Sequence, residues 1–283
     1  MASPFLLAFL IPLLPLLAGI AIGLFGRVLG EQSSRVGVAA VVSAFVAAVW
    51  VLYETSLLAP RHLLIDLGSP ISRDFFEFGL YLDRLSALMM VVITGVSTVV
   101  HLYSIRYLQG DRGYARFFSL LGLITSVLLW LVCSPNLFML FVFWQTLSWL
   151  LYLLLAYNYG HPPAYHNAFK TLFVHRIGDV AFLAGIALAF NLYGTLDFAL
   201  LFARAAESSI TLPLWPGGPP LVDAVTVLTL LIFIGAMAKS AQVPLHVWLP
   251  DIMDTPTPVS ALMHAGIVNA GGFLLNRLAP LYG

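Results

Sequence analysis

Residues 117–157 read FFSLLGLITSVLLWLVCSPNLFMLFVFWQTLSWLLYLLLAY, and this stretch decides the fold class. No Asp, Glu, Lys or Arg occurs between Arg116 and Lys170. A helix that crosses a bilayer needs about 20 mostly apolar residues, so the stretch is long enough for two such helices. Both can sit in lipid at little electrostatic cost.

The composition of the whole chain agrees with this prediction. Of its 283 residues 60% are hydrophobic and 9% are charged, whereas an ordinary soluble domain has about 25% charged residues. The mean hydropathy is +0.96. With 13 basic and 13 acidic residues the formal net charge is zero, so nothing indicates a nucleic-acid partner or an electrostatically steered acidic substrate. The lipid bilayer is the expected environment.

Cysteine and histidine usage indicates neither a metal site nor a cofactor. The single cysteine, Cys133, lies in an apolar run, which excludes an intrachain disulfide, a cysteine-rich metal site and thiol redox chemistry. His161 and His166 lie together in a predicted loop region, without the carboxylates or thiols that would complete a metal site.

A sliding window of about 20 residues predicts an all-α integral membrane protein with about eight transmembrane helices. The predicted spans are 5–26, 36–58, 82–105, 117–134, 136–157, 168–193, 222–249 and 258–280. The first apolar run, Phe5 to Leu24, has no basic residue before it and no clear cleavage site after it. We therefore interpret it as a retained span and not as a signal peptide.

Two segments are predicted to lie outside the membrane. Residues 60–81 contain five charged residues with Pro and Gly and are partly strand-like. Residues 195–220 contain a possible interfacial helix, Leu196 to Ala206, followed by the Pro/Gly-rich stretch Pro213 to Pro220.

One membrane domain is expected, in which residues 1–80 supply two helices with an extramembrane segment and residues 81–283 form the main bundle. Its orientation follows from Lys and Arg in short loops. The first and third loops carry Arg27, Arg35, Arg106, Arg112 and Arg116. This bias favours a cytoplasmic face for those loops and an N-terminus outside.

Arg176 and Asp179 fall near the first half of the sixth predicted span, and Lys239 falls deep in the seventh. A Lys or Arg at mid-membrane costs on the order of 2.5–3.5 kcal/mol on insertion scales, so such residues usually face a bundle interior and mark a pathway. Helical spacing pairs His166 with Lys170, His175 with Asp179, and Arg176 with Asp179. The Arg176–Asp179 pair is also explained by a purely structural ion pair, and both interpretations stay open.

Lys239 has no acidic residue within one helical turn, so burial would favour loss of its proton. Pro244 and Pro250 follow it, and the helix should break near Ser240 to Pro244. Broken backbone at membrane depth is tolerated where it lines a wet cavity or is buried in protein. With Ser240 and Gln242 nearby, Lys239 is predicted to load and release a proton there.

His264 lies in the next predicted span, within Met-His-Ala-Gly. A neutral imidazole at this position could relay a proton between its two nitrogens. The alternative is a core histidine whose hydrogen bonds are satisfied.

Four segments together resemble the antiporter-like subunits of respiratory complex I, their cyanobacterial relatives and the large subunit of Mrp sodium/proton antiporters. They are Phe169–Lys170, Arg176–Asp179, Ala238–Leu245 and Pro256–Ala265. The resemblance implies an antiporter-like fold in which Lys239 belongs to the broken seventh helix and His264 to a connecting hydrated chain. The expected proton pathway comprises Lys239, His264, Asp179, Arg176, Lys170, Gln145, Ser240 and Gln242, with the helix break at Pro244.

Two departures from that family stand out. Its pumping members carry a glutamate after Phe-Trp in the fifth span, whereas this chain has Phe143-Trp144-Gln145, so the acid expected beside Lys239 is replaced by an amide that cannot titrate. The chain also ends at Gly283, and we expect it to be truncated relative to the family, without the second broken helix.

After His264 the chain reads AGIVNAGGFLLNR over Ala265–Arg277. This is unlike the Ala-Thr-Met-Val of complex I and Mrp subunits and is similar to the DabB family, the membrane subunits of the two-component inorganic-carbon pump. The resemblance implies a bacterial inner-membrane protein that is not itself an enzyme. It would conduct protons for a DabA-like, zinc-containing partner that hydrates carbon dioxide.

Two alternatives remain from the sequence. A piece of a complex I or Mrp assembly would co-purify with quinone-linked subunits or exchange sodium for protons. A structural anchor would conduct nothing and would tolerate the loss of the charge on Lys239.

Overall fold

The computed structural model describes residues 4–57, 61–65, 78–160, 162–208, 210–213 and 220–282. The long helices are α1 (Pro4–Leu29), α2 (Gln32–Leu57), α3 (Arg84–Tyr107), α4 (Tyr114–Val132), α5 (Leu137–Leu155), α6 (Pro162–Tyr193) and α8 (Ala224–Lys239). The shorter elements are β1 (Arg61–Ile65), β2 (Phe78–Leu82), α7 (Phe198–Glu207), β3 (Thr211–Pro213), β4 (Pro220–Asp223), α9 (Thr257–Leu262) and α10 (Val268–Arg277).

The predicted all-α membrane class is confirmed. Among the described residues seven helical segments are long and apolar enough to cross a membrane, and the last of them runs from Thr257 to Arg277 through α9, a π-helical turn at Met263–Ile267, and α10. Helix α8 is apolar but has only 16 residues, or about 24 Å, which is shorter than a hydrocarbon core of about 30 Å.

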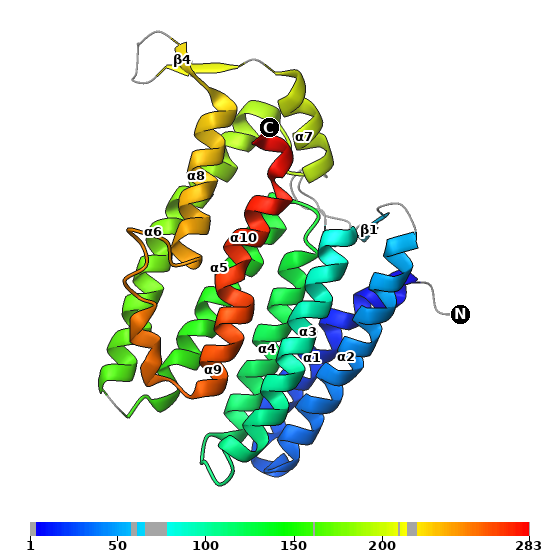
Figure 1. The fold of residues 1–283 in the computed structure, drawn as a ribbon, viewed down its shortest axis with the longest axis vertical. Helices are drawn as coiled ribbons and strands as arrows, with labels where there is room; N and C mark the ends of the chain where they lie inside the picture. The colour runs from blue at the N-terminus through cyan, green and yellow to red at the C-terminus, as the bar shows by residue number, and fades with distance from the viewer. Residues whose placement is uncertain are drawn as a thin grey trace.

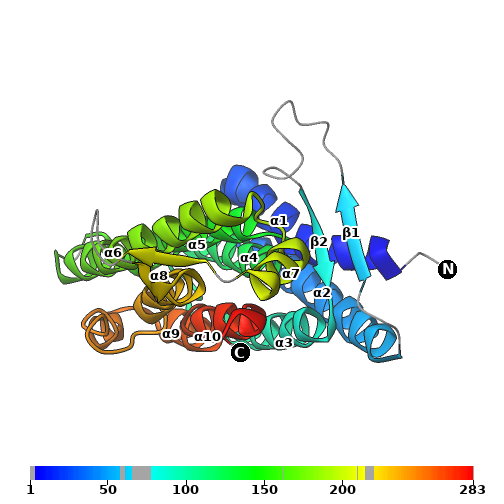
Figure 2. The same ribbon diagram turned by 90° about the horizontal axis from the view of Figure 1, so that it is seen from above.

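The helices stand side by side in two layers. Figure 1 shows the long helices running between the same two ends of the molecule. Seen from above, α6, α5, α4 and α1 form one layer, and α8, α10, α3 and α2 form the other (Figure 2). Arg27 lies near the end of α1, Arg35 near the start of α2, Arg106 near the end of α3, and Arg112 between α3 and α4. These helix ends all lie at the lower end of the molecule in Figure 1.

Close packing and hydroxyl groups hold α1 against α4. The Ser126 hydroxyl donates to the carbonyl of Pro12 at 2.7 Å, and the Ser119 hydroxyl donates to that of Gly19 at 2.7 Å. A methyl group added at Gly19 would lie 2.9 Å from the Leu123 side chain, so only glycine permits this approach. Small residues and interhelical hydrogen bonds replace the hydrophobic effect as the cause of helix association in lipid.

Both segments predicted outside the membrane carry short elements. Strands β1 and β2 pair antiparallel, with Arg61 opposite Leu82, which confirms the strand-like character, while residues 66–77 lie outside the described part of the chain. The predicted interfacial helix is α7, begun by the Asp197 carboxylate that accepts from the amide of Leu200. The Pro/Gly-rich stretch from Pro213 to Pro220 lies between β3, which ends at Pro213, and β4, which begins at Pro220, and residues 214–219 are not described.

Two boundaries needed correction. The predicted span 222–249 is helical only from Ala224 to Lys239, and the described residues from 240 to 249 form turns with no second half-helix. His166 lies in the first turns of α6 and not in a loop, because α6 begins at Pro162, and proline is well tolerated at the start of a helix. His161 is outside the described residues.

Candidate functional site

Lys239 is the last residue of α8 and is fully buried. Its ammonium group donates a hydrogen bond to the Ser148 hydroxyl of α5 and lies 4.8 Å from the ring centroid of Trp144. Trp144 and Ser148 are four residues apart and therefore share one face of α5. Lys239 is thus held by a hydroxyl and by the negative face of an indole ring.

Trp144 also connects Lys239 to the acidic residue of the site. The indole N–H of Trp144 donates to Asp179 Oδ1 at 2.8 Å. Asp179 in turn forms an ion pair with Arg176, at 3.4 Å between Oδ2 and Nη2, three residues earlier on α6. The Asp179 side chain is 6% exposed and that of Arg176 is 35% exposed, so the carboxylate is buried while the arginine side chain is partly exposed, although its Nε and Nη2 atoms are buried.

Close contact between α6 and α8 brings these charges together. A methyl group added at Gly178 would collide with the side chain of Ala238, and one added at Gly235 would lie 2.7 Å from Phe182 Cβ. The helices can approach this closely because both positions lack a side chain. The proximity of Arg176, Asp179 and Lys239, three residues of the predicted proton pathway, therefore has a packing cause.

The sequence suggested that residue 145 lies beside Lys239, but the structure places Gln145 beside Arg176. Its amide oxygen accepts a hydrogen bond from Arg176 Nη1, and the Arg176 guanidinium lies 5.6 Å from the ring centroid of Trp149. Residue 145 therefore acts on the arginine, and its link to Lys239 runs through Arg176, Asp179 and Trp144.

The helix break after Lys239 lies where Pro244 predicted it. Ser240 extends the last turn, its amide bonded to the carbonyl of Ala236, and its hydroxyl donates to the carbonyl of Val268 on α10 at 2.8 Å. Gln242 is exposed on the surface of this chain. Ser240 thus ties the broken end to the neighbouring helix, and among the described contacts neither side chain hydrogen-bonds Lys239.

Lys170 and His264 lie apart from this cluster. Lys170 forms an ion pair at 2.7 Å with Asp251, in the segment after the break, and its side chain is 48% exposed. His166, its predicted helical neighbour, is bonded instead to the carbonyl of Pro162. His264 is exposed in the π-helical turn. The described structure therefore does not connect His264 to Lys239.

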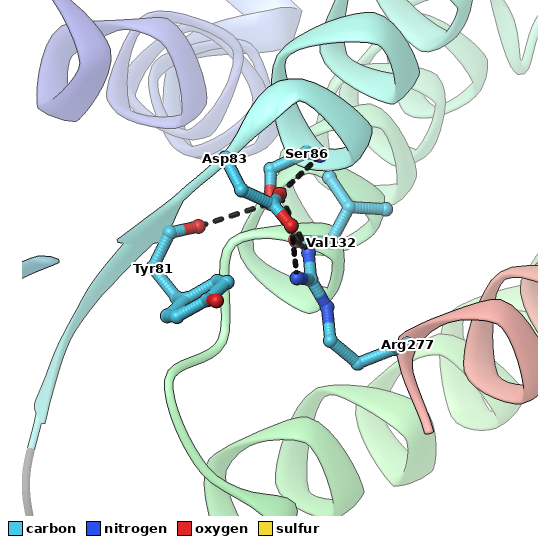
Figure 3. A network of polar contacts seen from close by, with 5 residues as sticks. All are labelled: Tyr81, Asp83, Ser86, Val132 and Arg277. Carbon is cyan, nitrogen blue, oxygen red and sulfur yellow. Dashed lines mark hydrogen bonds and ion pairs between the residues drawn. The ribbon is translucent and has the colours of Figure 1, made fainter. Parts of the chain in front are cut away.

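Sequence reasoning missed one strong ion pair. Arg277, 3% exposed, donates to Asp83 at 2.6 and 3.1 Å and to the Ser86 hydroxyl at 2.6 Å (Figure 3). Burial of Asp83 raises its pKa, but the hydrogen bond and charge of Arg277 outweigh burial and leave the pKa below its usual value of 3.8. Successive predicted spans cross the membrane in opposite directions, so the third span begins and the eighth span ends at the same face of the membrane. This signal could have suggested that Asp83 and Arg277 form a pair.

A multi-pass bundle with a buried lysine and aspartate and a partly exposed arginine beside a broken helix has the pattern of membrane ion transporters. Residues 134–283 match the family model described as NADH:quinone oxidoreductase/Mrp antiporter, TM, and residues 73–118 match that of NADH-Ubiquinone oxidoreductase (complex I), chain 5 N-terminus. The chain belongs to this family of antiporter-like membrane subunits, as its motifs predicted.

Individual relatives agree. The chain is 40% identical over 282 residues to the probable inorganic carbon transporter subunit DabB1 of Halothiobacillus neapolitanus, covering 98% of this chain and 47% of that protein. It is 38% identical over 283 residues to NADH-quinone oxidoreductase subunit L of Neisseria meningitidis serogroup B, covering 96% and 41%. A chain of the Mrp complex of Dietzia sp. DQ12-45-1b superposes with a TM-score of 0.80 at 25% identity, covering 96% and 28%. The chain thus spans less than half the length of these relatives.

Proposed function

We propose that this chain is the proton-conducting part of a membrane subunit that uses the proton gradient to drive inorganic-carbon accumulation. The observation that carries the proposal is the environment of Lys239. Its ammonium is buried against the Ser148 hydroxyl and the indole ring of Trp144. The carboxylate of Asp179 does not contact the ammonium directly but accepts a hydrogen bond from the indole N–H of the same Trp144. A lysine without a direct carboxylate contact is stabilised enough to hold a proton and yet able to release it.

The likeness to DabB1 supports the choice of inorganic carbon among the activities of the family. The partner in this proposal is a DabA-like, zinc-containing subunit, which would carry out carbon dioxide hydration while this chain supplies protons. The assembly would lie in a bacterial inner membrane with the basic loops at Arg27, Arg35 and Arg106 facing the cytoplasm and the N-terminus outside.

A substitution at Lys239 tests the proposal. Lys239→Met removes the titratable group while keeping its length and apolar stem, and carbon-dependent growth should be abolished at a normal level of assembled protein. Arg106→Met is the control, because Arg106 is an exposed cation at the end of α3 and should leave growth unchanged. Growth of the Lys239→Met strain would mean that the chain serves as a membrane anchor.

Identifying the proteins that co-purify with this chain would distinguish inorganic-carbon transport from the second candidate function, a role in a complex I-like or Mrp-type assembly. The 38% identity with subunit L from Neisseria over the whole chain favours a role in a complex I-like or Mrp-type assembly. Proteins that co-purify in mild detergent should include a zinc-containing partner under our proposal. Quinone-linked subunits, or sodium/proton exchange in vesicles, would support the alternative.

A further inference from the structure

His175 is a buried titratable group that the pathway predicted from the sequence leaves out. It is fully buried on α6, and neither ring nitrogen makes a hydrogen bond among the described residues. Its ring packs edge-on against Trp248, with centroids 4.7 Å apart. A buried polar group without a hydrogen bond destabilises the folded protein, so an imidazole with two such nitrogens calls for an explanation beyond packing.

The position of His175 is set by the helix break. Gly178, one turn further along α6, lies against Ala238, so His175 faces the region where α8 has ended. Trp248 closes this region from residues 240–254, the turn segment that follows α8. Its indole N–H donates to the carbonyl of Ala238 at 3.0 Å. Figure 1 shows α8 ending part of the way along α6, with the turn segment continuing beside it.

The charges around His175 are those of the candidate site. Arg176 is the next residue of α6, and it forms the ion pair with Asp179. Lys239 directly follows Ala238, whose carbonyl accepts a hydrogen bond from Trp248, the residue that packs against the imidazole. On α5 the nearby polar groups of the cluster, Gln145 and Ser148, are neutral. Because like charges repel, the imidazole and the Lys239 amine would compete for one proton.

Building on the proposed function, we propose that His175 accepts the proton that Lys239 releases toward the helix break. A lone pair on one imidazole nitrogen takes a proton from the Lys239 ammonium, which leaves a neutral amine and an imidazolium. The imidazolium then loses the proton on its other nitrogen toward the Lys170–Asp251 end of α6, and the neutral ring is restored. No electron transfer is involved, and the step uses the two ring nitrogens of histidine as a relay.

The Lys170–Asp251 ion pair lies further toward the start of α6. Lys170 is five residues before His175, which is about 7 Å of helix rise. Its partner Asp251 follows the break, and Asn167 donates to the Asp251 carbonyl at 3.2 Å, so this end of the turn segment is fixed to α6. His175 therefore stands between the buried lysine and an exposed ion pair, where a proton acceptor would complete a route.

The first test compares His175→Gln with His166→Gln, an exposed histidine on the same helix. Both changes keep a polar side chain that cannot carry a proton. At equal levels of the assembled complex, His175→Gln should lower bicarbonate accumulation about a hundredfold, the low end for a lost proton-transfer group, and should change the shape of its pH profile. His166→Gln should leave both unchanged. A His175→Gln curve equal to the wild-type curve, or merely scaled down, would overturn the proposal in favour of a packing role.

A second measurement needs no transport and no change at His175. The C2 hydrogen of histidine exchanges with deuterium at a rate that depends on ring protonation, and mass spectrometry resolves it for each histidine. If Lys239 and His175 compete for one proton, the rate at His175 should change about threefold or more in Lys239→Met, with His166 unchanged, because coupling between two sites is reciprocal. Equal rates at His175 would contradict the proposal. Full growth of Lys239→Met would instead refute the proposed function, so the two failures are distinguishable.

Discussion

Helices α1 to α4 and the region from α5 to α10 bury polar groups in different ways. Among the described residues of α1 to α4, the buried polar side chains are serines, threonines and His101. His101 Nδ1 lies 2.8 Å from the Ser97 carbonyl, and the Ser97 hydroxyl lies 2.6 Å from that of Thr125. The other region buries Lys239 and Asp179.

This difference indicates a division of roles. Neutral hydroxyls bonded to backbone carbonyls stabilise helix packing at little cost, whereas a buried charge costs several kcal/mol and persists where it serves a function or has a strong partner. We therefore expect substitutions in α1 to α4 to change stability alone and substitutions around Lys239 to change transport.

The largest expected effect is at the ion pair that joins the two regions, Asp83 with Arg277. Asp83→Asn leaves Arg277 buried without a counter-charge, which should destabilise the protein by about 3–5 kcal/mol. Unfolding in mixed micelles would measure this. The double variant Asp83→Asn with Arg277→Met should recover much of the loss, since no unpaired charge remains. Additive losses would show that the pair contributes little.

The same pair predicts an acid limit to stability. The folded pKa of Asp83 lies below its unfolded value of about 3.8, so the stabilisation is fully present above that pH and is lost as pH falls through the folded pKa. Wild-type stability should therefore decline below about pH 4 more steeply than that of Asp83→Asn. Parallel pH curves would contradict the assignment.

The second effect concerns Asp179, which stands beside two cations. Asp179→Asn can still accept the Trp144 indole hydrogen bond but leaves Arg176 and Lys239 uncompensated. We expect a loss of about 3 kcal/mol, near the low end for a buried pair because Arg176 is 35% exposed. Asp223→Asn, at the N-cap of α8, is the control, since asparagine caps a helix equally well. Normal protein level with lost transport would indicate a relay and not a structural pair.

The sequence was sufficient to predict seven of the eight spans, the position of the break and the family, because each depends on local features. Apolar length identifies a membrane helix, and Pro244 cannot continue one. The contacts between side chains of the site could not be predicted from the sequence, because they depend on which helices lie side by side. Nothing near Lys239 in the chain indicates Ser148, which lies 91 residues away.

The third effect is kinetic and concerns Gln145. The substitution Gln145→Glu would pair with Arg176, and the carboxylate of Asp179 would then be freer to act on Lys239 through the cluster. Lys239 should hold its proton more tightly and turnover should slow about fivefold, roughly 1 kcal/mol, most visibly at neutral pH. Bicarbonate accumulation against external pH, at equal protein levels, measures this. Indistinguishable curves would mean that residue 145 has no electrostatic influence on the lysine.

The smallest effect is expected at Ser126, and it tests the division of roles most directly. Ser126→Ala removes one interhelical hydrogen bond to the Pro12 carbonyl, which in membrane proteins averages about 0.6 kcal/mol, and transport should be unchanged. Ser43→Ala is the matched control, because its hydroxyl is exposed and bonds only within α2. The same change at Ser148 removes the acceptor of the Lys239 ammonium and should slow transport at a similar protein level. If Ser126→Ala slowed transport as much as Ser148→Ala does, α1 to α4 would have to take part in conduction, and the contrast between the two regions would be wrong.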